Sequence, residues 1–438
     1  MKHMGRGSLA KVPAVNILTR GKFVNITNMR TALNNPFSPG SDTVPEVWAG
    51  RTEQLSDWRD VVRPRRQAGL PERGRTILGE PGLGKSSLVR RIAQEALANG
   101  DWATPQLRMP LGGDPLKRVA AALLSLAEDA GLSIARERNI ANLLERVREV
   151  SIRGIAISLG GREGPEPYEA LKDLLVEIGR AAMKADRVAI VHIDEMQNIT
   201  DDAALSQLRF ALGDALTSED EVTVPGNVVV SRSLPVAVYL TGLPEFADTA
   251  GARKGATFAR RFKTTVLDAL GDDDLLSALQ PFVLDGWDVT TADGDRAKVW
   301  MDPDAAGTII DLCKGEPFLF QLAGERSWYA ATGARITKEH VLAGWRGAVG
   351  EASAHVDRMI ERLPEREHRF LEAMAALEPG ERTLSAIAHA TGYDTPTSQG
   401  TIARRLDQVR GIINRGSVYT FRHRAVEARL TSSWPWID

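Results

Sequence analysis

The sequence has almost no cysteine and no long apolar run. Its 438 residues include one cysteine, Cys313, so it can form neither an internal disulfide nor a cysteine-based metal site. Such thiol-poor chains are typical of the reducing cytoplasm. No stretch of eighteen apolar residues is present, and none follows the first basic residues, so we expect neither a membrane span nor a secretory signal. These absences predict a cytoplasmic protein without membrane contact.

Acidic residues are absent from the first 34 positions, which carry only basic charges. A basic arm of this kind can lie on nucleic acid or on another subunit, or it can be a solvated leader. The rest of the composition is ordinary for a globular protein, with 43% hydrophobic and 26% charged residues. A net charge of −2 for the whole chain favours neither acidic nor basic partners. Any preference for a charged partner must therefore come from the local placement of charged residues. The length predicts two or three domains.

One segment fits the phosphate-binding pattern G-x-x-x-x-G-K-[ST]: Gly79, Glu80, Pro81, Gly82, Leu83, Gly84, Lys85 and Ser86. It stands between a predicted strand at 75–78 and a predicted helix that starts near Ser87. The glycines let successive N–H groups face an anion, and the helix N-terminus adds partial positive charge. Lys85 would reach the β- and γ-phosphates of a nucleotide, and the Ser86 hydroxyl would ligate Mg²⁺. A chance glycine-rich turn would lack the flanking strand and helix.

A second apolar run, residues 187–193, ends in Asp194 and Glu195. In P-loop NTPases a strand of this kind carries the carboxylate that binds Mg²⁺. Asp194 is therefore the predicted metal ligand, and Glu195 is placed to polarise an attacking water. Two carboxylates at the end of an apolar strand are costly without a metal or a polar partner. The two motifs together predict binding of ATP or GTP.

Predicted strands alternate with predicted helices along the first 270 residues, which indicates a parallel sheet covered on both faces. The predicted strand at 234–240 ends in Thr241, and residues 152–159 can form an inserted strand or hairpin. Residues 277–349 are predicted to be entirely helical. Three helices near 365–377, 384–390 and 399–409 precede two short strands within 411–421, an order that predicts a winged helix-turn-helix. The predicted domains are an arm (1–34), an α/β P-loop core (35–270), a small helical lid (271–355) and the winged helix (356–438).

This order of motifs resembles the AAA+ ATPases close to origin-recognition and initiator-loading proteins, and the related STAND signalling ATPases. The segments that carry the resemblance are 79–86, 188–195 with Gln197, 240–244, 258–262 and 315–317. The resemblance implies an ATPase that uses ATP and Mg²⁺. It also implies that Gly50 and Arg51 lie beside the adenine and that Pro317 packs on the nucleotide from the lid.

The resemblance further implies that Thr241 senses the γ-phosphate and that Arg260 or Arg261 completes the site of a neighbouring subunit in a homo-oligomer. Each has a simpler alternative, because Thr241 can merely end a strand and the arginines can end a solvated helix. Initiator-type lids carry an arginine where this chain has Phe318 and Leu319. That departure favours slow hydrolysis.

Two functions follow from these motifs. In the first, favoured by charge placement, the protein is an ATP-dependent binder of double-stranded DNA. The third helix and the wing would contact DNA through Thr401, Arg404, Arg405, Arg415, Arg422 and Arg424. In the alternative, a STAND-like signalling switch, for example in phage defence or regulation, the winged helix packs on the core and its arginines pair with acidic residues there.

Overall fold

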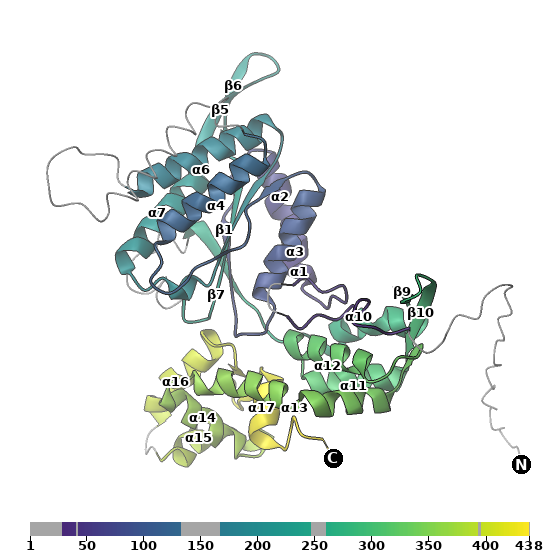
Figure 1. Ribbon diagram of the computed structural model, residues 1–438. Coiled ribbons are helices and arrows are strands. Elements are labelled where there is room, and N and C mark those ends of the chain that lie inside the picture. Colours follow the sequence, from purple (N-terminus) through teal and green to yellow (C-terminus); the bar gives the residue numbers. More distant parts are fainter. Residues whose placement is uncertain (1–28, 41–42, 133–166, 247–259, 393–395, 438) are drawn as a thin grey trace, which may run out of the picture.

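The computed structural model describes residues 29–40, 43–132, 167–246, 260–392 and 396–437. Figure 1 shows three parts: an α/β core, a lid, and a C-terminal helical domain that continues from the lid through one long helix. Most of the basic arm and the strand or hairpin predicted at 152–159 lie outside the described residues. Among the residues described, no helix is long and apolar enough to cross a membrane.

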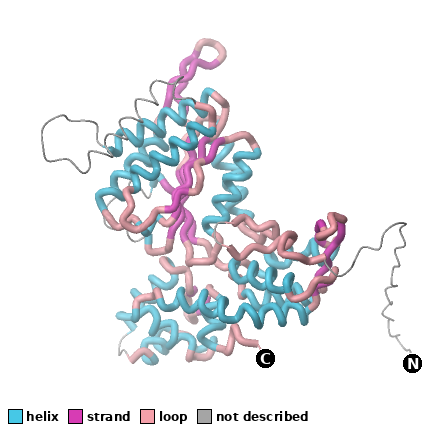
Figure 2. The backbone as a smooth tube through the Cα atoms, in the orientation of Figure 1, coloured by secondary structure: helices cyan, strands magenta, loops and turns pink. Residues whose placement is uncertain are grey.

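The core is built on a six-stranded sheet. All its strand pairs are parallel, which confirms the predicted parallel sheet. Figure 2 shows the strands of the core between two groups of helices. Its strands run in the order β2-β4-β7-β1-β8, and β3 also pairs with β4. The strands are β1 (Gly74–Leu78), β2 (Trp102–Ala103), β3 (Leu107–Arg108), β4 (Ala189–Asp194), β7 (Val236–Gly242) and β8 (Phe262–Val266). The three central strands are fully buried because helices cover both faces, which explains the largely apolar sequences of β4 and β7.

Two groups of helices cover the sheet, each with its own apolar cluster. One group is α1 (Thr52–Ser56), η2 (Asp57–Val62), α2 (Arg63–Gln67) and α3 (Lys85–Ala98); the other is α4 (Pro115–Asp129), α6 (Pro167–Lys184) and α7 (Asp202–Thr217). A hairpin of β5 (Glu219–Val224) and β6 (Val228–Ser233), which the sequence analysis did not predict, projects from the core (Figure 1).

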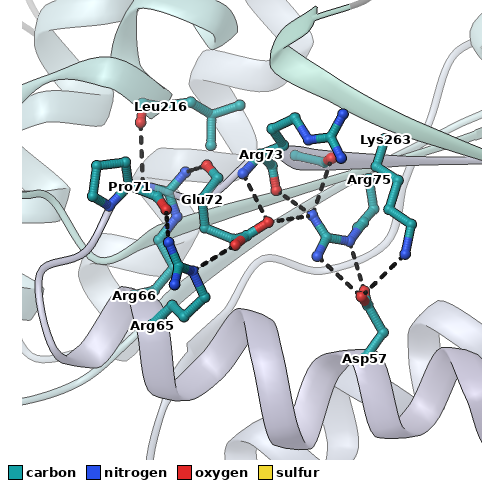
Figure 3. A network of polar contacts seen from close by, with 10 residues as sticks. Asp57, Arg65, Arg66, Pro71, Glu72, Arg73, Arg75, Leu216 and Lys263 are labelled. Carbon is teal, nitrogen blue, oxygen red and sulfur yellow. Dashed lines mark hydrogen bonds and ion pairs between the residues drawn. The ribbon is translucent and has the colours of Figure 1, made fainter.

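A network of charged side chains joins the first helices to the sheet (Figure 3). Arg75 on β1 donates to Asp57 at 2.6 Å and to Glu72 at 3.1 Å. The buried Arg66 donates to the carbonyl oxygen of Leu216 at 3.1 Å. Buried guanidinium groups are tolerated only with such partners. The network therefore fixes the helical segment that leads from residue 50 to β1.

The lid contains α10 (Asp272–Leu284), α11 (Pro303–Cys313), α12 (Pro317–Tyr329) and the first part of α13 (Lys338–Glu361). It also contains a three-stranded sheet of β9 (Trp287–Thr290), β10 (Arg296–Met301) and β11 (Arg335–Ile336), so the prediction that 277–349 is entirely helical was wrong. In β10 buried and exposed residues alternate over only a few positions, and so short a pattern does not distinguish a strand from part of a helix.

Residues 35–40 and 43–50 form a strap that packs on the lid rather than only on the core. The ring of Phe37 stacks on Phe282 with centroids 5.6 Å apart. Gly324 on α12 lies so close to this ring that a Cβ atom would come within 2.2 Å of it. The strap thus physically joins the lid to the start of the core.

The C-terminal domain has the predicted order of three helices and two short antiparallel strands. These are α14 (Glu365–Ala375), η4 (Pro379–Glu381), α15 (Leu384–Ala390), α16 (Pro396–Gln408), β12 (Ile413–Asn414) and β13 (Thr420–Phe421), followed by an additional helix, α17 (Arg424–Thr431). The boundary predicted between residues 355 and 356 falls within α13, so the lid and the last domain share one continuous helix.

Candidate functional site

The P-loop lies between β1 and α3, as predicted. Gly82 and Gly84 have φ angles of 84° and 78°, in the left-handed region that favours glycine. A Cβ atom on Gly82 would also lie 2.3 Å from the ring of His355 on α13. The amide of Phe318, at the start of α12, donates to the Gly82 carbonyl oxygen at 3.2 Å. The loop is therefore in direct contact with the lid and with the long helix.

Lys85 is turned back onto its own loop. Its ammonium group donates to the carbonyl oxygens of Gly79 at 2.9 Å and Glu80 at 3.0 Å. Burial lowers the pKa of Lys85, and the nearby Asp194 and Glu195 oppose that shift. Phosphate oxygens offer this buried cation stronger acceptors than two carbonyl groups do.

The P-loop serine and the carboxylate at the end of β4 meet directly. The Ser86 hydroxyl donates to Asp194 Oδ2 at 2.7 Å, and Gln106 Nε2 donates to the same oxygen at 2.7 Å. Thr241 donates to the other carboxylate oxygen and lies 3.1 Å from His192 Nε2. Burial alone would raise the pKa of Asp194, but His192 and these hydrogen bonds lower it overall. Asp194 is therefore held ionised.

These residues fit a magnesium ion. A hydroxyl and an ionised carboxylate that face each other are the hard oxygen donors that Mg²⁺ prefers, together with substrate phosphates. Ser86 and Asp194 would hold the ion, which neutralises charge on the transferred phosphoryl group.

Glu195 has a left-handed backbone, with φ 58° and ψ 44°. Its amide donates to Asp194 Oδ1 at 2.8 Å, and the Gln197 side chain donates to its carboxylate. Glu195 lines the cavity beside the P-loop. Thr241, by contrast, is completely buried and has its hydroxyl on Asp194. The role of Thr241 as a sensor remains a prediction, because its hydroxyl donates a hydrogen bond to Asp194.

A cavity of about 310 Å³ opens between the P-loop, the strap and the lid. The P-loop contributes residues 81–87, and the lid contributes Pro317 and Phe318. Pro317 thus lines the cavity, and its packing on a nucleotide remains a prediction. Arg51 also lines it, and Arg51 Nη2 donates to the Leu83 carbonyl oxygen at 2.9 Å. Burial lowers the pKa of Arg51 to about 10. Gly50 and Arg51 both have left-handed backbones, which turn the strap into α1.

The sequence analysis missed several residues of this cavity: Ser38, Trp48, Arg108, Phe320, Gln321 and His355. Gln321 ties the strap to α12 by donating to the Val47 carbonyl oxygen at 2.8 Å and accepting from the Ser38 amide at 2.9 Å. No spacing in the sequence predicts these residues, because they come from four segments, the strap, β3, α12 and α13, that only the fold brings together.

Arg260 and Arg261 lie immediately before β8. β8 runs parallel to β1, and the P-loop follows the C-terminal end of β1. The two arginines, which precede β8, therefore lie near the N-terminal ends of these strands, on the side of the sheet away from the P-loop. Arg261 is paired with Asp214 at 2.6 Å, whereas Arg260 is exposed. Neither reaches the cavity of its own chain, so a role in a neighbouring subunit remains a prediction, with Arg260 the more accessible residue.

Most of the arginines predicted to contact DNA are engaged within the chain. Arg405 pairs with Glu367 at 2.9 Å, Arg415 with Asp407 at 3.1 Å, Arg422 with Asp407 at 2.8 Å and Asp268 at 3.5 Å, and Arg424 with Asp272 at 2.7 Å. Asp268 lies in the segment that leads from the core into the lid, and Asp272 is the first residue of α10 in the lid. Thr401 and Arg404 on α16 are exposed.

The C-terminal domain is also joined to the P-loop itself. Arg362, the residue after α13, forms an ion pair with the buried Glu80 of the P-loop. Burial raises the pKa of Glu80, and Arg362 opposes that shift. Arg410 bridges Glu245, just beyond β7, at 2.6 Å and Glu367 of α14 at 3.0 Å.

A third tie joins the C-terminal domain to the lid. His423 lies 2.7 Å from Glu316, which is fully buried at the start of α12, and His355 lies 3.6 Å from the same carboxylate. Burial opposes ionisation of Glu316, but His423 and His355 together outweigh it and lower the pKa of Glu316 to about 2. Burial likewise lowers the pKa of His423, and Glu316 reverses this to a net increase.

Comparisons with known proteins agree with this architecture. The family model of the AAA ATPase domain matches residues 47–230. A Walker-type ATPase of Pyrococcus abyssi has a TM-score of 0.52 and 15% identity, covering 87% of this chain and 96% of that one. The ORC2 protein of Aeropyrum pernix, solved in ADPNP–ADP complexes, has a TM-score of 0.52 and 15% identity, covering 90% and 95%. No curated protein matches the chain.

At 15% identity these likenesses concern the fold alone. They confirm the predicted P-loop α/β core of AAA+ type, and the family match confirms an AAA ATPase domain. The closer relation to STAND proteins, the winged helix and DNA binding remain predictions.

Proposed function

Because the chain contains an AAA ATPase domain, we propose that this protein is a nucleotide-gated switch. It binds ATP with Mg²⁺, hydrolyses it slowly, and changes the docking of its C-terminal domain as it does so. The observation that carries this proposal is the ion pair between Glu80 of the P-loop and Arg362 of the C-terminal domain. A residue within the phosphate-binding loop thus holds the domain that would report the nucleotide state.

The contacts support the following roles in hydrolysis. Lys85 and the loop amides bind the phosphates, and Ser86 and Asp194 hold the metal ion. Glu195 accepts the proton of the attacking water from its position in the cavity. On α12, Phe318 and Leu319 stand where initiator-type lids carry an arginine, and the lack of that arginine fits slow turnover.

The gating follows from the position of Lys85. In the observed state Lys85 is bonded to the carbonyl oxygens of Gly79 and Glu80. Phosphates would draw the ammonium group away from these carbonyls and change the conformation of the loop at Glu80. The side chain of Glu80 is bonded to Arg362, so the two loop conformations differ in how well they hold the C-terminal domain. A ligand shifts such an equilibrium only through this difference.

Distance measurements between the core and the C-terminal domain test the switch. The only native cysteine, Cys313, is buried, so labels at Asp60→Cys and Gln408→Cys, both exposed positions, can be attached selectively. We expect the distance distribution between them to differ between the ATP-analogue, ADP and nucleotide-free states, and Lys85→Ala to abolish that response. Identical distributions in all three states, with nucleotide shown to be bound, would rule the switch out.

Binding of double-stranded DNA is the second candidate, favoured by the exposed Thr401 and Arg404 on α16. Arg404→Ala should then flatten the slope of log affinity against log salt by about 0.9 if that arginine contacts one phosphate. Arg369→Ala, on an exposed part of α14, is the control. Failure of the wild-type protein to bind any duplex at low salt, in every nucleotide state, would eliminate this candidate.

A further inference from the structure

Gln197 lies between the proposed base and the end of β7. Its amide nitrogen donates to the Glu195 carboxylate, and its amide oxygen accepts from the Leu243 backbone amide at 2.9 Å. We infer that Gln197 is the positioning residue of the ATPase, which fixes Glu195 and couples it to the segment that the C-terminal domain holds. This inference rests on the proposed hydrolysis.

Both halves of the side-chain amide are needed for this arrangement. A carboxylate accepts hydrogen bonds and a backbone amide donates them, so only one orientation of the Gln197 amide satisfies both partners. The side chain packs closely against Gly242, where a Cβ atom would lie 2.9 Å from Gln197 Oε1. Glutamate is uncommon in the left-handed region that Glu195 adopts, and such a conformation persists only when its surroundings fix it.

The same side chain leads towards the C-terminal domain. Two residues beyond Leu243, Glu245 pairs with Arg410 at 2.6 Å and lies 3.8 Å from Arg362. Arg362 in turn pairs with Glu80 of the P-loop. Undocking of the C-terminal domain would free Glu245 and, through the short segment to Leu243, loosen the acceptor side of Gln197. The position of the base thus depends on domain docking through a chain of direct contacts.

The test compares Gln197→Met with Gln94→Met, an exposed position on α3. Methionine keeps the length and volume of glutamine but neither donates nor accepts strongly. We expect kcat of Gln197→Met to fall about 10- to 100-fold, the equivalent of one lost hydrogen bond to a charged group, while the Kd for ATP stays within about twofold. Gln94→Met should match the wild type. An unchanged kcat, or equal losses in kcat, ATP affinity and melting temperature, would overturn the inference.

Glu245→Gln tests the coupling, since it weakens the ion pairs with the C-terminal domain without changing shape. If Gln197 carries the coupling, Glu245→Gln alters kcat in the wild-type background but not in Gln197→Met, a non-additive cycle. Additive effects would overturn the coupling. Absence of turnover in the wild type would refute the proposed hydrolysis, whereas normal turnover in Gln197→Met beside an inactive Glu195→Gln would refute only the role of Gln197.

Discussion

Removing the Arg362 guanidinium should loosen the C-terminal domain in a pH-dependent way. Glu80 is 1% exposed and the Arg362 side chain 25% exposed, so Arg362→Met leaves a buried carboxylate without its main partner. Breaking a buried ion pair costs about 3–5 kcal/mol. Protonation of Glu80 sets an upper limit on the loss of stability in this variant. Protonating a carboxyl of ordinary pKa 4.5 at pH 7 costs about 3.4 kcal/mol, at 1.36 kcal/mol per pH unit.

Part of that cost already exists in the wild type, because burial raises the pKa of Glu80 despite Arg362. We therefore expect Arg362→Met to lower the free energy of unfolding by about 2 kcal/mol at pH 7. At pH 5 the loss should fall below about 1 kcal/mol, because a carboxyl with a raised pKa is readily protonated there. Nucleotide exchange should accelerate as the domain undocks.

Urea unfolding at the two pH values, with release of a fluorescent ATP analogue, measures both effects. Arg358→Met, at an exposed position on α13, is the control and should behave as the wild type. Adding Glu80→Gln to Arg362→Met should recover most of the stability, since no charge is then buried alone. A loss of equal size at pH 5 and pH 7, or no recovery in the double variant, would refute this reasoning.

Four further outcomes are expected. Lys85→Ala should abolish ATP binding measured by calorimetry, and near-normal affinity would contradict the P-loop assignment. Glu195→Gln should keep ATP and Mg²⁺ binding but slow single-turnover hydrolysis by about 10²- to 10⁴-fold; wild-type turnover would show that another group is the base. If Arg260 acts in a neighbouring subunit, specific activity should rise with protein concentration and Arg260→Ala should remove that rise. The tie between Glu316 and His423 should hold best between about pH 4.5 and 6.5. The lowered pKa of Glu316 contributes stability above 4.5, and the raised pKa of His423 contributes stability below 6.5 that is lost as pH rises through it. The protection of amides at the start of α12, measured as hydrogen exchange relative to the intrinsic rate at each pH, should therefore fall at alkaline pH, and a rise in protection there would contradict this.

Much of the core could be predicted because its signals are local. The P-loop needs glycines at fixed positions between a strand and a helix, and Gly82 and Gly84 have the left-handed backbones that such a loop requires. The run that ends at Asp194 is apolar because β4 is buried on both faces. Its carboxylate therefore had to meet a polar partner, and it meets Ser86.

The errors and omissions concern contacts between distant segments. The short strands of the lid have too few residues for a clear alternation, and the hairpin of β5 and β6 was not predicted. His355 and Gln321 reach the cavity from helices more than 200 residues beyond the P-loop in sequence, and no spacing indicates that. Arginines that looked like a DNA-binding surface by charge alone are paired with Glu367, Asp407 and Asp272.

The sequence by itself determined the chemistry of the phosphate site, because loop curvature, strand burial and carboxylate position depend on neighbours along the chain. Only the tertiary structure decided what that chemistry is connected to. Glu80 and Arg362 are 282 positions apart, and their ion pair exists because α13 brings the C-terminal domain against the P-loop. Charge in a sequence has no direction, so whether an arginine faces a solvent-exposed surface or a buried carboxylate depends on packing alone.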